Sequence, residues 1–372
     1  MGVGLGAEPC RPFRHTGARI PAVNMARGPR VLQAAHRWVV LLTAAAVCVL
    51  ANSAAARVAY VRFEAPGNIT FPQSINSAGA VAGYFDNGAD VGFVRDPAGT
   101  ITTFAPQDSR STTSAFINDQ YLIAGDYDDG DNFRGYLRQP DGTIDAFEVP
   151  GSAATEVSGL NNGGAVVGSY LVEPTNAISH GYLRAADGTI TTFDAPKSAR
   201  GTIASSINDE GVIAGYAYND RSVSHGFIRS ANGKFTIFSA ADSGHGENQG
   251  TFPVSINSKG AVTGYYVDAS GAGHGFVRMP KGDRLEFDAP DAGSRFGTLP
   301  RQIDRAGTIA GTYADSNNIF HGFLRRRDGN LAEFDCRGPK FIDTYVSAIN
   351  DAGVIAGSAR KIDRDLGFLR VP

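Results

Sequence analysis

The feature that most constrains this chain is a segment that occurs in seven copies along it. The copy at 207–216 reads Ile-Asn-Asp-Glu-Gly-Val-Ile-Ala-Gly-Tyr, and His-Gly-Phe-Ile-Arg follows at 225–229. The Ile/Leu-Asn pair recurs at spacings of 42, 43, 47, 49, 47 and 46 residues, with Asp in the sixth copy. The slot is filled in turn by Asn76, Asn118, Asn161, Asn208, Asn257, Asp304 and Asn350. Self-similarity at a period of roughly 40–50 residues predicts a solenoid, a propeller or another repeat array.

Each repeat is predicted to form four short antiparallel strands. The first strand ends at Ile-Asn, and Asn-x-x-Gly favours a turn because Asn bonds its own backbone and Gly accepts a positive φ. The Val-Ile-Ala-Gly-Tyr run is the second strand, Gly-Phe-Leu-Arg or a close variant is the third, and Asp-Gly turns lead into the fourth. The sequence therefore predicts an all-β fold, a seven-bladed β-propeller of four-stranded antiparallel blades.

The two ends of the repeat region predict that the ring is closed. Residues 57–66 match the fourth strand of the other repeats, whereas the last repeat stops after its third strand, at Pro372. We therefore expect the N-terminal strand to complete the last blade, so that the propeller spans residues 57–372. Closure of this kind removes the exposed sheet edges through which strands aggregate.

The first 56 residues are predicted to direct export. An apolar run of 14 residues, Trp38–Ala51, follows several basic residues and precedes Ser-Ala-Ala-Ala at 53–56, as in a secretory signal peptide. We assign residues 25–56 to the signal peptide, with cleavage near Ala56. Residues 1–24 are either a non-native extension ahead of a true start at Met25 or a disordered cytoplasmic leader. The mature protein is expected to be secreted or periplasmic, with no membrane span, since the run is short for one.

Composition excludes some classes of function. The formal net charge is −3, and six of the 34 basic residues lie before residue 57. A nucleic-acid-binding protein needs a basic face, so no nucleic-acid partner is expected. The chain also lacks His-Glu-x-x-His, Gly-x-Ser-x-Gly and a phosphate-binding loop.

The repeat resembles that of the HAF-repeat family of bacterial extracellular proteins. The residues that carry the resemblance are Ile-Asn-x-x-Gly, the following Ala-Gly-Tyr, His-Gly-Phe (usually His-Ala-Phe in the family) and the ending Thr-Thr-Phe-Asp-Ala-Pro. The second and seventh copies lack the histidine. The resemblance covers residues 57–372 and implies export and a β-propeller-like fold. It brings no assigned activity and no catalytic residues.

Four histidines open the third strand of their repeats: His180, His225, His274 and His321. Matching positions in blades that diverge lie too far apart to share one metal ion. The residue fourteen further on should lie opposite on the fourth strand, which pairs three of these histidines with Asp, His225 with Ser239, and Arg134 with Glu148. This pattern predicts cross-strand side-chain pairs. The arginine that ends each third strand is expected to make a repeated bond with the adjacent turn.

Two further sets are candidate ligand sites. A threonine lies six residues before every Asn or Asp of the repeat, where each innermost strand begins, so a ring of hydroxyls at the channel mouth is one interpretation and a loop cap is the other. The set comprises Thr70, Thr112, Thr155, Thr202, Thr251, Thr298 and Thr344. The acidic hairpin holds Asp126, Asp128, Asp129 and Asp131, whose alternating carboxylates suit Ca²⁺; the alternative is a solvated hairpin.

The repeats differ most in the loops that lead into the innermost strands. The longest, 239–255, carries His245 and Glu247, and neighbouring loops add Arg200 and Arg295. Because activity in repeat folds lies in such departures from symmetry, these residues are candidate ligand contacts. The leading hypothesis is a monomeric binding or interaction scaffold, with a glycan or peptide at the channel mouth. The alternatives are an extracellular polysaccharide hydrolase or lyase and a structural cell-surface protein.

Overall fold

The computed structural model describes residues 58–113, 115–173, 178–336, 341–362 and 364–372. The predicted leader (1–24) and signal peptide (25–56) lie outside these residues. The described part consists of strands and turns without a helix, which confirms the all-β prediction. Accordingly, the described residues include no helix able to cross a membrane.

The strands form sheets of 8, 9, 8 and 4 strands. Strands that follow one another within a sequence repeat pair antiparallel, and single parallel pairs, such as Ile69 with Asp365, join neighbouring repeats in the three larger sheets. We describe the strands by repeat, as groups. The first group is β2 (Ile69–Ile75), β3 (Val81–Asp86), β4 (Asp90–Arg95) and β5 (Ile101–Phe104). The second group begins with two short strands, β6 (Ser111–Thr112) and β7 (Phe116–Ile117), which both pair with β8 (Ile123–Asp128), and continues with β9 (Phe133–Arg138) and β10 (Ile144–Phe147). The third group is β11 (Ala154–Leu160), β12 (Val166–Leu171), β13 (Ser179–Arg184) and β14 (Ile190–Phe193).

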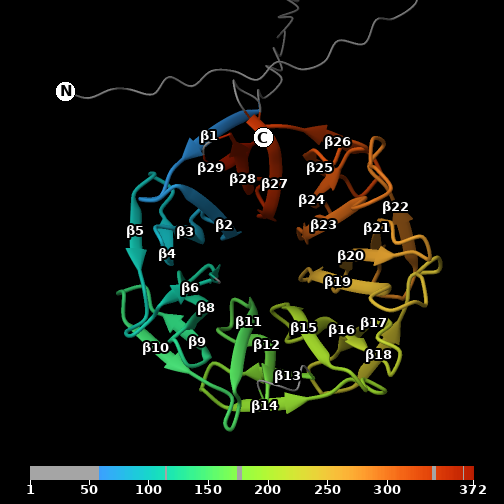
Figure 1. Cartoon of the computed structure of the whole chain (residues 1–372), viewed down its shortest axis with the longest axis horizontal. Helices are drawn as coiled ribbons and strands as arrows, with labels where there is room; N and C mark the ends of the chain where they lie inside the picture. The colour runs from blue at the N-terminus through green and yellow to red at the C-terminus, as the bar shows by residue number, and fades with distance from the viewer. Residues whose placement is uncertain (1–57, 114, 174–177, 337–340, 363) are drawn as a thin grey trace, which may run out of the picture.

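The remaining groups continue the same order. They are β15 (Thr202–Ile207), β16 (Ile213–Tyr218), β17 (Ser224–Arg229) and β18 (Phe235–Phe238); β19 (Gly250–Ile256), β20 (Val262–Val267), β21 (Gly273–Arg278) and β22 (Arg284–Phe287); β23 (Thr298–Ile303), β24 (Ile309–Ala314), β25 (Phe320–Arg325) and β26 (Leu331–Phe334); and β27 (Phe341–Ile349), β28 (Ile355–Lys361) and β29 (Asp365–Val371). Figure 1 shows the groups around a common centre, with the first strand of each innermost.

The last group takes its outer strand from the other end of the chain. The strand β1 (Ala59–Phe63) pairs antiparallel with β29 in the register Ala59↔Val371 to Phe63↔Gly367. Figure 1 shows β1 beside β29, next to the C-terminus. The ring of Phe63 also meets Phe93 of the first group at 6.1 Å, and Arg364 pairs with Glu64 at 3.3 Å. The N-terminal strand therefore joins the first and last repeats, as the sequence predicts.

The repeated asparagine links each group to the next. Its Oδ1 accepts from the backbone of its own turn, as in the bond from Ala80 N to Asn76. Its Nδ2 donates to the backbone carbonyl of the same slot in the next repeat, at 2.8–3.2 Å, for Asn76, Asn118, Asn161, Asn208, Asn257 and Asn350. The last of these bonds runs from Asn350 to Asn76, so the series returns to its start. Buried amides paired at both ends fix neighbouring groups against each other.

The repeated arginine makes a second link between groups. Each guanidinium lies over the fourth-strand phenylalanine of the preceding group, with the carbon Cζ 4.7–5.2 Å from the ring centroid. Five of these arginines also donate from Nη1 to the carbonyl of the residue that follows, which bears out the predicted bond with the turn. The glycine opposite each phenylalanine is required for space: a Cβ on Gly181 would lie 2.4 Å from the Phe193 ring.

The sixth slot leaves one link unmade, which gives a direct test. Asp304 receives the bond from Asn257 and caps its own turn through Thr308 N, but a carboxylate has no donor for the carbonyl of Asn350. We expect Asp304→Asn to supply that donor and to raise the free energy of unfolding by about 0.5–1.5 kcal/mol. Urea unfolding measures it. The reverse change, Asn118→Asp, should destabilise the protein, and an Asp304→Asn variant no more stable than wild type would contradict the assignment.

The role of β1 gives a second test. Deleting residues 57–66 removes the partner of β29 and uncovers a sheet edge, so we expect a lower melting temperature and self-association. Differential scanning fluorimetry and light scattering measure both. A truncated protein that stays monomeric with an unchanged melting temperature would show that β1 is dispensable.

Candidate functional site

The repeated threonines lie in loop caps. All seven are buried, with at most 3% of the side chain exposed. In six repeats the hydroxyl oxygen accepts a hydrogen bond from a backbone N of its own loop, at 2.8–3.1 Å. In the remaining one, Thr112, the hydroxyl pairs with that of Ser109 at 3.1 Å. The loop-cap interpretation therefore describes these residues, and a ligand does not reach them as a ring of free hydroxyls.

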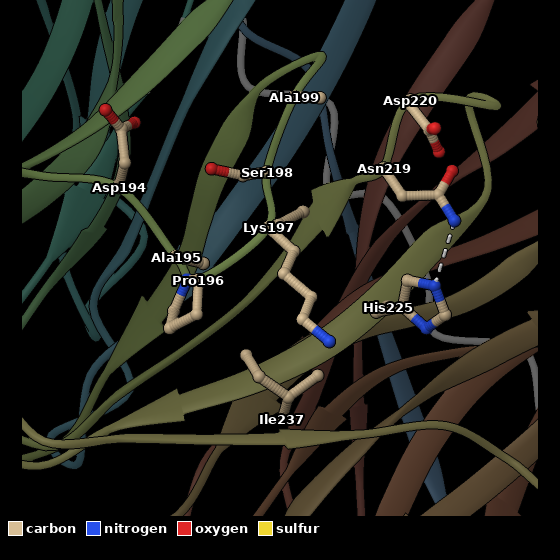
Figure 2. Close-up of a pocket in the computed structure, with 11 residues that line it drawn as sticks. Asp194, Ala195, Pro196, Lys197, Ser198, Ala199, Asn219, Asp220, His225 and Ile237 are labelled. Carbon is tan, nitrogen blue, oxygen red and sulfur yellow. Dashed lines mark hydrogen bonds between the residues drawn. The ribbon is translucent and has the colours of Figure 1, made fainter.

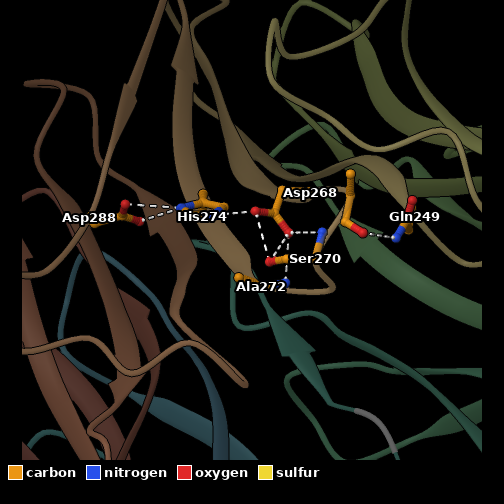
Figure 3. Close-up of polar contacts among 7 residues, drawn as sticks. Gln249, Asp268, Ser270, Ala272, His274 and Asp288 are labelled. Atoms are coloured by element: carbon orange, nitrogen blue, oxygen red, sulfur yellow. Dashed lines mark hydrogen bonds and ion pairs between the residues drawn. The ribbon is translucent and has the colours of Figure 1, made fainter.

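The histidines form the predicted cross-strand pairs. Nδ1 of His180, His274 and His321 lies 2.8–3.0 Å from the nearest carboxylate oxygen of the aspartate fourteen residues on, and Nδ1 of His225 lies 2.9 Å from Ser239 Oγ. Arg134 pairs with Glu148 at 3.1 Å, which confirms the pattern for that repeat too. Figure 3 shows that His274 lies between two carboxylates, Asp288 on one side and Asp268 of the preceding hairpin on the other.

These partners move the histidine pKa values in opposite directions. The hydrogen bond and the charge of Asp335, with Asp315 behind it, outweigh burial and raise the pKa of His321. For His274, burial lowers the pKa, but the bonds and charges of Asp288 and Asp268 reverse that effect and the net shift is upward. For His225, burial and the nearby charge of His245 lower the pKa. A carboxylate partner stabilises the imidazolium, and a hydroxyl does not.

The His225–Ser239 pair is not arranged as a nucleophile and its base. The Oδ1 of Asn219 accepts from Arg221 N and Val223 N, so its Nδ2 must face His225 Nε2, at 3.3 Å. Nε2 is therefore the acceptor, and Nδ1 carries the proton that it donates to Ser239. A base for Ser239 would need the opposite tautomer.

A surface pocket of about 900 Å³ lies beside His225. Figure 2 shows Lys197 directed toward it, with Asn219, Asp220 and Ile237 around it. Lys197 has a left-handed backbone conformation, with φ of 68°. Sequence reasoning missed this pocket, because it forms where the loop after β14 meets the hairpin after β16, and no motif marks such a meeting point.

The four hairpin aspartates take separate roles. Asp126 is buried and accepts from Thr113 Oγ1 at 2.6 Å and from Val157 N of the next group at 2.8 Å. Asp128 and Asp129 accept from backbone N atoms of the hairpin, Asp129 also pairs with Arg134, and Asp131 is exposed. The described residues hold no group of three or more His, Cys, Asp or Glu placed to bind a metal. The Ca²⁺ interpretation stays a prediction.

The candidate loop residues lie on the surface. His245 and Glu247 are exposed on the loop between β18 and β19, which is held by Gln249 through bonds to Gly246 and Ala269. Arg200 donates to the carbonyl of Asp220, and Arg295 lies over the Phe296 ring at 4.9 Å. The structure does not gather these residues into one cluster of contacts.

A different set of residues faces the axis of the ring. In β2, β11 and β23, buried and less buried residues alternate. The less buried residues are those one and three positions after the repeated threonine. Glu156 on β11 and Arg301 on β23 are exposed although both lie on innermost strands, which places them toward the axis. At the asparagine end, the inner-strand ends of all seven groups line an axial cavity of about 210 Å³.

Aromatic rings cluster on one side of the axis. Phe252, directly after Thr251, is buried, with 5% exposed, and stacks on the half-buried Tyr265 with centroids 5.0 Å apart and 15° between the ring planes. Tyr216 and Tyr218 lie against the same phenylalanine at 5.2 and 6.3 Å. These four residues form what we call the axial aromatic cluster. Sequence reasoning missed it, because its members come from two repeats and from second strands as well as first strands.

The charged residues near this cluster have perturbed pKa values. Burial among the surrounding strands and the charge of Asp126 raise the pKa of Glu156, whose Oε2 accepts from Ser169 Oγ at 3.2 Å. Burial lowers the pKa of Arg301, and Tyr265 opposes that change. Burial raises the pKa of Tyr216 and of Tyr265. Perturbed pKa values cluster at functional sites, which makes these residues candidates.

Comparisons with known proteins support the fold. No protein-family model and no curated protein matches the chain, so the resemblance to HAF-repeat proteins stays a prediction. Among solved structures it is similar to a streptogramin B lyase, with a TM-score of 0.56 and 16% identity over 85% of this chain and 98% of that one. It is also similar to a catalytically inactive virginiamycin B lyase from Staphylococcus aureus with quinupristin, with a TM-score of 0.57 and 13% identity over 85% of this chain and 100% of that one. Both are β-propellers, and at such identity the likeness shows the fold alone.

The opposite pKa shifts of His321 and His225 predict opposite pH dependences. The raised pKa of His321 means that its pair with Asp335 stabilises the fold fully below the ordinary pKa of 6.5, and that this contribution is lost as pH rises through the higher folded value. The destabilisation caused by His321→Gln should therefore grow, by about 0.5–1 kcal/mol, as pH falls from roughly 8 to 6.

His225→Gln is the matched control for that experiment. Because the folded pKa of His225 is lowered, its contribution is present above the ordinary value and is lost as pH falls through the folded one. Urea unfolding of both variants across this pH range makes the comparison, and two parallel pH profiles would contradict the assignment.

Proposed function

We propose that this protein is an exported, seven-bladed β-propeller with four strands in each blade, closed by β1, that acts as a binding scaffold. The seven sequence repeats, each with its own run of consecutive strands, support the blade number. The pairing of β1 with β29 and the bond from Asn350 to Asn76 support the closure. The likeness to propeller lyases agrees with it. Export to the periplasm or the exterior rests on the signal-peptide pattern in residues 25–56.

The proposed ligand is a glycan bound at the axis. The observation that carries this proposal is the axial aromatic cluster next to exposed polar residues of the innermost strands. Aromatic faces supply a flat apolar surface, and hydroxyl and charged groups beside them supply hydrogen bonds. Sugars present an apolar ring face with polar edges, so this combination suits them. A peptide is the alternative ligand, and a glycan array beside a peptide array separates the two.

An extracellular hydrolase or lyase is the second candidate. The two similar structures are lyases by title, and at their low identity the reaction type has to come from experiment. Turnover of a bound glycan, read as new reducing ends or as unsaturated-sugar absorbance, would decide for the enzyme. Wild-type rates in His245→Ala and Glu247→Ala would then show that the two loop residues are not catalytic, and Glu156 would be the next candidate. No binding to any array would favour the structural cell-surface protein.

The aromatic cluster gives the quantitative test. We expect Tyr265→Ala to weaken glycan binding at least tenfold, about 1.4 kcal/mol, because it removes one stacking face. Isothermal titration calorimetry measures the affinity, and a thermal melt confirms that the variant folds. Phe133→Ala is the matched control, since Phe133 is an aromatic residue 41% exposed on β9, outside the cluster. Equal losses in both variants, or none in Tyr265→Ala, would rule out the cluster as the binding surface.

A further inference from the structure

Arg301 is the one charged residue in its tier of the axial wall. It lies three residues after Thr298, and the matching positions in the other repeats hold Gln73, Ala115, Ser158, Ser205, Val254 and Ser347. On β23, Pro300 before it is buried and Arg301 is exposed, so the side chain projects away from the packed interior. The next residue, Gln302, lines the axial cavity. A single guanidinium thus faces the axis among small or neutral neighbours.

That guanidinium has no partner among the described residues: Arg301 makes no hydrogen bond, ion pair or ring contact there. The arginines that end the third strands differ, since each lies over a phenylalanine. Burial lowers the pKa of Arg301, yet a guanidinium stays charged at neutral pH. An exposed guanidinium with no counter-charge beside it is available to an anionic ligand.

The neighbouring groups leave the charge available. Glu156, the acidic residue of the axial wall, bonds Ser169 and lies three repeats away along the chain. Tyr265 is the titratable group whose interaction with Arg301 is strongest, and Tyr265 stacks on Phe252. The strand that carries Arg301 packs against the strand that carries Tyr265, and no carboxylate of the described residues pairs with the guanidinium. A ligand ring on the accessible face of Tyr265 would bring a substituent on its edge toward Arg301.

We infer that Arg301 recognises an anionic substituent, a carboxylate or a sulfate, on a glycan bound at the axial aromatic cluster. The inference rests on the proposed glycan-binding function and narrows it to acidic sugars. Guanidinium nitrogens match the two oxygens of a carboxylate or sulfate in a bidentate geometry that Lys does not reproduce.

The test compares acidic and neutral probes on the full chain. The probes are tetragalacturonate, its fully methyl-esterified form, and a carrageenan tetrasaccharide with and without its sulfates. We expect wild type to bind one acidic probe at least tenfold more tightly than the neutral form of that probe. The probe that shows this preference tells whether the recognised anion is a carboxylate or a sulfate. Arg301→Gln should abolish that preference, Arg301→Lys should restore part of it, and Arg326→Gln, an exposed arginine of the β25–β26 turn, should leave it intact.

Other results separate this inference from the function on which it rests. If neutral and acidic forms bind equally, or if Arg301→Gln keeps the preference, Arg301 is not the anion contact, while glycan binding stands. If no probe binds, the glycan proposal fails. Whether Arg301 binds an anion is then tested with inorganic sulfate. A melting temperature that rises with sulfate, relative to chloride at equal ionic strength, in wild type but not in Arg301→Gln would keep the anion site. An equal rise in both, or none, would overturn it.

Discussion

The hydrogen bond from one repeated asparagine to the backbone of the next repeat is the contact on which this fold depends. One side chain has two tasks: its oxygen closes its own turn, and its nitrogen holds the neighbouring group. Both atoms are buried, so each bond also prevents an unsatisfied polar group. Because the bond from Asn350 reaches Asn76, the first and last repeats are joined by the same chemistry as any adjacent pair.

The outer part of each junction uses a second repeated contact, which explains why small and large residues alternate so strictly. The third-strand arginine covers the phenylalanine of the preceding group, and that ring in turn covers the glycine of its own third strand, as in Arg229, Phe193 and Gly181. A methyl group at the glycine would displace the ring from under the guanidinium. The repeated arginine, phenylalanine and glycine therefore serve packing. The repeated histidines are also structural, because each pairs with a residue on the neighbouring strand. Repetition here marks structure, and binding chemistry is to be sought among residues that do not repeat.

Sequence reasoning succeeded where an interaction lies inside one repeat and was incomplete where it joins two. The fourteen-residue pairing of His321 with Asp335 follows from hairpin geometry alone, and the structure has it. The bond donated by Asn76, the ring under Arg229 and the bond from Val157 N to Asp126 all depend on how neighbouring repeats are placed. The period of the repeat does not specify that placement. For the threonines, the sequence left a ring of hydroxyls and a loop cap as alternatives, and their burial and backbone bonds agree with the cap.

The candidate site could not be predicted from the sequence, because its residues lie in different repeats and come together only through the arrangement of the innermost strands. Arg301, in Leu-Pro-Arg-Gln-Ile, looks like an ordinary surface arginine, and Glu156 looks like an ordinary loop carboxylate. The innermost strands of all repeats line one cavity at the asparagine end, and Glu156 and Arg301 are exposed on two of these strands. Their common position appears only when the repeats are arranged around one axis. A scaffold built from near-identical units therefore needs just one unlike residue on its inner wall to acquire a preference for one charge of ligand.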